Sequence, residues 1–139
     1  MIDIDNFKHF NDEHGHHVGD QVLREVAQVL QQQTRGSDVA ARFGGEEFIV
    51  VLADIPRRLA LERAEQLRSC VENLALTSVG APGSVTISIG LAEFPADGNT
   101  LEALLRAADK APYEAKRAGR NRVVAASPGG AVVPFRIAS

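Results

Sequence analysis

Apolar and polar residues alternate in several stretches of the chain, with the period of two that is typical of a half-buried β-strand. The alternation from Met1 to Asp5 predicts the end of a first strand whose beginning is missing. Residues 39–52 predict two strands joined at Gly44-Gly45, because both positions of a tight hairpin turn favour glycine. Residues 85–91 predict a fourth strand, in which Val, Ile and Leu alternate with Thr, Ser and Gly.

Three other stretches carry apolar residues every three to four positions, which is the period of an amphipathic helix. The first follows a loop rich in His and Gly, with Asp20 as its expected N-cap and Gly36 as its end. The second covers about residues 57–76. The third begins after Thr100, a residue type that caps helices, and ends at Gly119.

A short strand over residues 122–125 follows the third helix, and Ser127-Pro128-Gly129-Gly130 then breaks the pattern. We therefore expect one domain over residues 1–125 and a poorly ordered tail over residues 126–139. Helices segregated from a mostly antiparallel sheet indicate an α+β sandwich of the ferredoxin-like or polymerase-palm type.

The composition limits the partners of this domain. The chain has 139 residues, of which 45% are hydrophobic, enough to bury one core. A net charge of −3 gives no basic field that could hold a nucleic-acid polymer. No apolar run approaches the ~20 residues of a membrane span, so membrane contact is expected only through domains upstream of this chain. The lone Cys70 excludes an internal disulfide and fits a reducing, cytoplasmic location.

Three carboxylates are expected to meet at one edge of the sheet. Asp3 lies where the first strand ends, and Glu46 and Glu47 start the return strand of the hairpin. Crowded carboxylates repel one another, so such a cluster persists only when it is protonated or neutralised by a hard cation such as Mg²⁺. Mg²⁺ shares its remaining positions with substrate phosphates, which favours phosphoryl or nucleotidyl transfer. The alternative is that both glutamates are solvated charges beside a hairpin.

Further short motifs occur along nearly the whole chain. They are Asp3-Ile4-Asp5-Asn6-Phe7-Lys8, Asn11-Asp12, Gly15-His16 with Gly19-Asp20, Arg42-Phe43-Gly44-Gly45-Glu46-Glu47-Phe48, Thr86-Ile87-Ser88-Ile89-Gly90, Ala107-Ala108-Asp109, Tyr113-Glu114-Ala115-Lys116 and Gly119-Arg120-Asn121. With them the chain resembles the GGDEF family of bacterial diguanylate cyclase domains, in the variant that has Glu at the Asp position of the family's name. The resemblance implies a palm fold like that of class III nucleotidyl cyclases. It also implies the condensation of two GTP molecules into cyclic di-GMP and two pyrophosphates.

The resemblance also implies roles for individual residues. Asp3, Glu46 and Glu47 would be the catalytic carboxylates. Asp3, the Ile4 carbonyl and Glu46 would hold Mg²⁺ or Mn²⁺, while Glu47 would be a further ligand or would activate the ribose 3′-hydroxyl. The substrate-binding residues would be Asn11 and Asp20 for guanine, and the backbone amides near Phe7 and Lys8 together with Lys116 and Arg120 for the triphosphate.

Substrate choice and assembly follow from the same roles. A carboxylate accepts hydrogen bonds from guanine N1 and N2, a pattern that adenine does not present, so GTP is expected over ATP. One domain holds one GTP, and each 3′-oxygen attacks the other α-phosphate, so two domains must face each other in a transient homodimer.

The segment Arg35-Gly36-Ser37-Asp38 matches the R-x-x-D motif that many family members carry as an inhibitory site. The planar guanidinium of arginine suits a phosphodiester and a guanine edge. The motif predicts a product-binding site at Arg35 and Asp38 and inhibition by cyclic di-GMP. The alternative is an ordinary solvated ion pair in a turn.

Pro112 departs from the family pattern because it stands inside the third predicted helix. Proline in a helix interior costs about 3 kcal/mol unless the helix kinks, and Lys116 and Arg120 lie just beyond it. A degenerate GGDEF domain that binds GTP or cyclic di-GMP as a sensor is therefore the alternative to an enzyme. A dimerisation module without a ligand is the third possibility, and it is disfavoured by the intact acidic and basic motifs.

Overall fold

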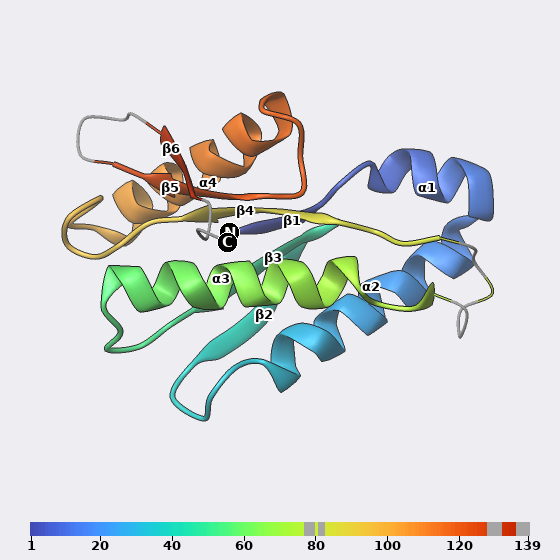
Figure 1. Ribbon diagram of the computed structural model, residues 1–139, viewed down its shortest axis with the longest axis horizontal. Coiled ribbons are helices and arrows are strands. Elements are labelled where there is room, and N and C mark those ends of the chain that lie inside the picture. The colour runs from blue at the N-terminus through green and yellow to red at the C-terminus, as the bar shows by residue number, and fades with distance from the viewer. Residues whose placement is uncertain (77–79, 81–82, 128–131, 136–139) are drawn as a thin grey trace.

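The computed structural model describes residues 1–76, 80, 83–127 and 132–135. Within these residues a six-stranded sheet forms the centre of the molecule, in the order β2-β3-β1-β4-β5-β6 (Figure 1). Among the strand pairs of the described residues, only β4–β5 is parallel. The strands are β1 (Ile2–Ile4), β2 (Val39–Gly44), β3 (Glu47–Val51), β4 (Ile87–Leu91), β5 (Val123–Ala126) and β6 (Val132–Phe135).

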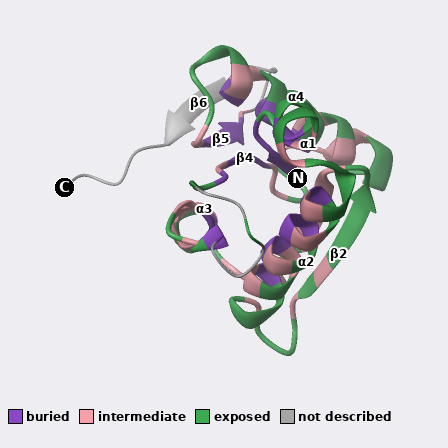
Figure 2. Cartoon of the chain, turned by 90° about the vertical axis from the view of Figure 1, so that its right-hand side faces the viewer, coloured by how far each residue is buried: buried purple, intermediate pink, exposed green. Residues whose placement is uncertain are grey.

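Helices cover both faces of this sheet. Helices α2 and α3 contact each other on one face, and α4 contacts β4 and β5 on the other (Figures 1 and 2). The main apolar core lies under α2 and α3, while a smaller cluster of Ala111, Ala115 and Val124 lies under α4. This arrangement confirms the predicted α+β, palm-like architecture. The helices are α1 (Phe7–His14), α2 (His16–Gln32), α3 (Arg57–Glu72) and α4 (Leu101–Arg117).

The segment after β1 is more helical than predicted. Residues expected to form a loop instead form α1, because Phe7 and Phe10 provide a buried face. Gly15, with a φ of 86°, separates α1 from α2 and precedes the first residue of α2. Asp20 therefore lies inside α2, and its prediction as the N-cap is wrong.

The hairpin forms where Gly44-Gly45 predicted it. Gly45 adopts a positive φ of 52°, and the Arg42 guanidinium closes the turn by donating to the Gly45 carbonyl at 2.7 and 2.9 Å. Glu46 lies in the turn and β3 begins at Glu47, so the prediction that both glutamates start the strand is wrong for Glu46.

Helix α4 begins as predicted, with the Thr100 side chain accepting a hydrogen bond from the Ala103 amide at 3.1 Å. The helix continues through Pro112 to Arg117. Pro112 is buried against β4: a Cβ added to Gly90 would lie 2.3 Å from Pro112 Cδ, so a glycine is needed there. Pro112 therefore does not end the helix, and the residues beyond it remain part of α4 beside the sheet.

The strand β5 ends at Ala126, and β6 pairs antiparallel with it. The prediction of a tail without structure is therefore wrong for residues 132–135, whereas its residues 128–131 and 136–139 lie outside the described part of the chain. None of the described helices is long and apolar enough to cross a membrane.

Candidate active site

Strand β1 brings Asp3 beside the hairpin. Asp3 pairs with Glu47 in the antiparallel register, and the Ile4 amide donates to the Glu46 carbonyl at 3.2 Å. Side chains of directly opposed residues in such a pair lie about 5 Å apart at their Cβ atoms. The predicted convergence of Asp3, Glu46 and Glu47 at one end of β1 is therefore present.

The electrostatics of this acidic edge, defined as Asp3, Glu46 and Glu47, show that the carboxylates are crowded. Burial raises the pKa of Asp3, Lys116 opposes that rise, and the charges of Glu46 and Asp5 add to it. Burial also raises the pKa of Glu47, as do the charges of Asp3, Asp109 and Glu46. A cation placed at the edge would relieve this repulsion.

Lys116 supplies the one cation that contacts Asp3 in the described residues. Its Nζ lies 2.9 Å from Asp3 Oδ1, so the last turn of α4 reaches across to β1. Arg120 follows two residues beyond the cap of α4, in a left-handed conformation with a φ of 63°. The structure thus brings Lys116 to the acidic edge and holds Arg120 on the turn that follows.

The donors at the acidic edge fit Mg²⁺ or Mn²⁺ better than a softer metal, because they are carboxylate and carbonyl oxygens. Among the described residues, no group of three or more His, Cys, Asp or Glu side chains is arranged to hold a metal ion. Mg²⁺ commonly uses one or two carboxylates and completes its shell with water and phosphate oxygens. The oxygen donors of the edge therefore suit a hard divalent cation whose remaining positions are filled from outside the protein.

The predicted guanine residues meet where α1 and α2 pack together. Asn11 Oδ1 is buried and accepts no hydrogen bond. A Cβ on Gly19 would lie 1.7 Å from this oxygen, so only glycine permits the close approach of the two helices. Asp20 is the next residue of α2 and is exposed. Asn11 and Asp20 are thus near neighbours across a helix pair, and Asn11 carries an unused acceptor.

The first turn of α1 follows β1 directly, with only Asp5 and Asn6 between them. The first helical hydrogen bond runs from the Phe10 amide to the Asn6 carbonyl at 3.0 Å. A helix has no internal acceptor for its first amides, so those of Phe7 and Lys8 can bind an anion. They lie at the same end of β1 as the acidic edge.

The Arg35–Asp38 motif forms a closed turn away from the acidic edge. Asp38 Oδ2 accepts from the Arg35 amide at 2.9 Å and from Arg35 Nε at 3.4 Å, and Oδ1 accepts from the Ala53 amide at 3.3 Å. The bond from the Arg35 amide is the largest cause that lowers the pKa of Asp38. The carboxylate of Asp38 thus accepts its hydrogen bonds from groups within the domain, while half of the Arg35 side chain is exposed.

Arg63 of α3 also reaches this turn, with Nη2 3.4 Å from Asp38 Oδ2. Arg35 and Arg63 line the same surface hollow of about 370 Å³. Sequence reasoning missed Arg63, because its position on α3 gives no signal that it faces a turn 25 residues earlier.

The sequence profile described as "Diguanylate cyclase, GGDEF domain" matches residues 1–122. The chain belongs to the GGDEF family. This GGDEF domain is 47% identical over 123 residues to Diguanylate cyclase A of Treponema denticola. It is 45% identical over 126 residues to the response regulator PleD of Caulobacter vibrioides. These alignments cover 88% and 89% of this chain but only 33% and 28% of the two relatives.

Solved structures support the same family. The GGDEF domain of YfiN from Pseudomonas aeruginosa superposes with a TM-score of 0.85 at 39% identity, covering 91% of this chain and 79% of that one. The GGDEF domain of DgcB from Caulobacter crescentus, solved in complex with c-di-GMP, superposes with a TM-score of 0.79 at 37% identity, covering 89% and 74%. The fold and the family are thus shown by independent comparisons.

Asp5 of this GGDEF domain is a residue that sequence reasoning left without a role. It is 5% exposed and accepts hydrogen bonds from Thr86 Oγ1 at 2.7 Å, Ser88 Oγ at 2.6 Å and the Asn121 amide at 3.0 Å. The Thr-x-Ser spacing in the fourth predicted strand was the available signal, because it places two hydroxyls on one face. Asp5 joins the end of β1 to β4 and to the turn after α4.

The Gly119-Arg120-Asn121 motif ends α4 in the conformation of a Schellman cap. The Arg120 amide donates to the Ala115 carbonyl at 2.8 Å, and the Gly119 amide to that of Lys116 at 3.3 Å. All three residues of the motif have positive φ angles. Asn121 then bonds to α3 through Glu72 Oε1 and Arg68 Nη1, each at 2.7 Å. This turn fixes the backbone from which Arg120 extends.

Proposed function

We propose that this GGDEF domain is a diguanylate cyclase that joins two GTP molecules into cyclic di-GMP and two pyrophosphates. The observation that carries the proposal is the pairing of Asp3 with Glu47 beside Glu46, with Lys116 in contact and raised pKa values for the two paired carboxyls. Relatives named as diguanylate cyclases support it.

Asp3, the Ile4 carbonyl and Glu46 would hold Mg²⁺ or Mn²⁺ in this proposal. When bound, the metal supplies charge neutralisation and polarises a phosphoryl oxygen. Glu47 would be a further ligand or would accept the proton of the attacking 3′-hydroxyl.

The remaining residues would hold the nucleotide. Lys116 and Arg120 would contact the triphosphate together with the amides of Phe7 and Lys8. Lys116, whose Nζ lies 2.9 Å from Asp3 Oδ1, would be within reach of a phosphate group held at the acidic edge. Asn11 and Asp20 would bind the guanine edge, with the exposed Asp20 carboxylate as an acceptor.

Two such domains would have to face each other, because each 3′-oxygen attacks the α-phosphate bound by the other domain. The domain would act in the cytoplasm, where its GTP substrate is found. A transient homodimer makes the rate per domain rise with protein concentration while most of the protein is monomeric.

The direct test is to incubate the purified chain with GTP and MgCl₂ and to measure cyclic di-GMP by mass spectrometry over a dilution series. We expect product, with a rate per domain that rises roughly in proportion to protein concentration. Glu46→Gln is the matched control, since it removes one charge at nearly constant size and should abolish product. Absence of product at every concentration would leave a nucleotide sensor, and equal product from the control would remove the metal assignment.

A second proposed function is product binding at the Arg35–Asp38 turn. Arg35 and Arg63 offer two guanidinium groups beside one hollow, which suits the phosphodiesters of cyclic di-GMP. In calorimetry, Arg35→Ala should weaken cyclic di-GMP binding at least tenfold while leaving the initial rate unchanged. Identical binding by parent and variant would show that the turn is only a structural ion pair.

A further inference from the structure

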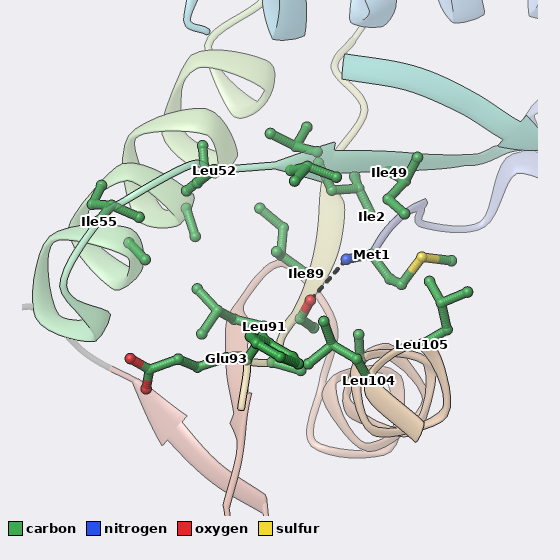
Figure 3. Close-up of a pocket in the computed structure, with 18 of the residues that line it drawn as sticks. Met1, Ile2, Ile49, Leu52, Ile55, Ile89, Leu91, Glu93, Leu104 and Leu105 are labelled. Atoms are coloured by element: carbon green, nitrogen blue, oxygen red, sulfur yellow. Dashed lines mark hydrogen bonds between the residues drawn. The ribbon is translucent and has the colours of Figure 1, made fainter. Parts of the chain in front are cut away.

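The two ends of β1 have different surroundings. An apolar cavity of about 460 Å³ lies beside Met1 at the amino end, lined by residues of β3 and β4 among others (Figure 3). At the carboxyl end, Asp5 accepts a hydrogen bond at 3.0 Å from the amide of Asn121, in the turn after α4. The polar contacts that join β1 to the turn carrying Arg120 therefore lie at the carboxyl end.

The backbone of this turn is strained. Gly119, Arg120 and Asn121 follow one another with φ angles of 113°, 63° and 46°. Glycine adopts a positive φ freely and asparagine tolerates it, whereas arginine adopts it rarely. A strained residue of this kind persists only where its surroundings overdetermine the conformation, so the neighbours of Arg120 must hold it in place.

Hydrogen bonds hold Arg120 from both sides. Its amide donates to the Ala115 carbonyl at 2.8 Å, and Arg122 Nε donates to the Arg120 carbonyl at 2.9 Å. The next residue, Asn121, is bound through its amide to Asp5 and through its side chain to α3. Of these contacts, the link to α3 alone is formed by side chains at both ends, so it can be removed without changing a main-chain hydrogen bond.

Arg68 and Glu72, one turn apart on α3, form a clamp around the Asn121 side chain. Arg68 Nη1 donates to Asn121 Oδ1, and Asn121 Nδ2 donates to Glu72 Oε1, both at 2.7 Å. Arg68 Nη1 also donates to Glu72 Oε2 at 2.7 Å, which closes a ring of side chains. Because a side-chain amide both donates and accepts, Asn121 matches the clamp at both of its polar atoms.

Glu65 orients the clamp independently of the turn. Its Oε1 lies 2.7 Å from Arg68 Nε and 2.6 Å from Arg68 Nη2. The Arg68 side chain is only 15% exposed, so its guanidinium is held between the two glutamates. It uses Nε and Nη2 toward Glu65 and Nη1 toward Glu72 and the turn. Lysine could not reproduce this division, because its ammonium group is a single point of charge.

We propose that Arg68 and Glu72 are positioning residues for Arg120, which keep its guanidinium directed at the triphosphate by holding the Asn121 side chain. This role rests on the proposed cyclase function, in which Arg120 contacts the triphosphate. Partly exposed ion pairs add little to stability, so the main effect of the clamp is on the position of Arg120. Position matters there, because a misplacement of about 1 Å costs up to about 100-fold in rate.

The test is calorimetry with MgCl₂ and 3′-deoxy-GTP, which lacks the attacking hydroxyl, on the parent chain, Arg68→Lys and Asn121→Gly. Asn121→Gly keeps the amide that bonds to Asp5, tolerates the positive φ and removes only the side chain that α3 holds. Each variant should weaken 3′-deoxy-GTP binding about tenfold and change GMP binding by less than about twofold, because GMP lacks the outer phosphates. Arg58→Lys, at an exposed position of α3, is the matched control and should bind both nucleotides like the parent.

Coupling to Arg120 separates positioning from a general structural role. Arg120→Ala should itself weaken 3′-deoxy-GTP binding about tenfold or more, and Arg68→Lys added to it should have no further effect. A structural loss would instead add to the effect of Arg120→Ala and would weaken GMP binding as well.

Two results would overturn the role of the clamp alone. Arg68→Lys and Asn121→Gly could bind 3′-deoxy-GTP like the parent while Arg120→Ala binds it weakly, or the effects of Arg68→Lys and Arg120→Ala could add. Unchanged binding by Arg120→Ala would overturn both the clamp's role and the triphosphate assignment. Synthesis of cyclic di-GMP is measured separately, so a parent that binds the nucleotide without forming product would contradict the cyclase function and leave the binding test decisive for the clamp.

Discussion

Asp3 and Asp5 lie two residues apart at the end of β1, and both are buried, yet their surroundings differ. Asp5 accepts hydrogen bonds from Thr86, Ser88 and the Asn121 amide. Asp3 contacts Lys116 and faces other carboxylates, and burial raises its pKa. The same residue type thus completes a hydrogen-bond network at one position and remains short of partners at the other.

We propose that this difference separates a stabilising role from a functional one. A buried carboxylate with matched donors stabilises the fold, whereas one with repelling neighbours destabilises it until a ligand supplies the missing charge. We define the satisfied region, which contains Asp5, Arg68, Glu72 and Asn121, as the Asp5 network. The acidic edge depends on this network for its position, because Asp5 holds the end of β1 against β4 and the turn after α4.

The largest expected effect comes from breaking the Asp5 network at its centre. Asp5→Ala removes an acceptor from three donors and should lower the free energy of unfolding by about 3 kcal/mol or more. Urea denaturation measures this loss, and Asp12→Ala, at an exposed position of α1, is the control. A loss below about 1 kcal/mol in Asp5→Ala would mean that water replaces these bonds without cost.

A substitution at the acidic edge should have the opposite effect and stabilise the domain. The pKa of Glu47 is raised in the folded state, so its carboxylate opposes folding at neutral pH, and this penalty disappears below the ordinary value of 4.5. Glu47→Gln should therefore stabilise the domain by about 0.5 kcal/mol at pH 7, a small gain because water screens the side chain. The two proteins should be equally stable near pH 4. A lower free energy of unfolding for Glu47→Gln than for the parent at pH 7 would contradict the inference that the Glu47 charge opposes folding.

A comparably small effect, of the opposite sign, is expected at the periphery of the Asp5 network. Arg68 and then Asn121 lower the pKa of Glu72, so its contribution to stability is present above 4.5 and is lost as the pH falls through the lowered value. Glu72→Gln should cost about 0.5 kcal/mol at pH 7, because the side chain is partly exposed. Denaturation midpoints measured between pH 3 and 7 should fall less steeply with decreasing pH in the variant than in the parent.

Local signals in the sequence predicted much of this structure. Alternation located β1, the hairpin and β4, and Thr100 located the start of α4. The position of Asp3 at the end of a strand, together with the tight Gly-Gly turn, was enough to predict that the three carboxylates meet. These features depend on neighbouring residues, which is why periodicity and turn chemistry reveal them.

Other features depend on partners that are distant in the sequence. Asp5 meets hydroxyls 81 and 83 residues away, and no local pattern specifies those contacts. Asp20 looked like a helix cap because the first turn of α2, residues 16–19, is rich in His and Gly and was expected to be a loop. Pro112 looked disruptive because its fit against Gly90 requires the packing of α4 on β4.

Our central proposal is that Asp3 is left short of partners because it serves the proposed reaction and not the fold. Its most direct test is the rate of cyclic di-GMP formation from GTP and Mg²⁺ by Asp3→Asn, measured at an equal concentration of folded protein. The account predicts a rate at least about 100-fold below that of the parent, in a domain that still folds. A rate within twofold of the parent would contradict it and would place Asp3 outside the chemistry.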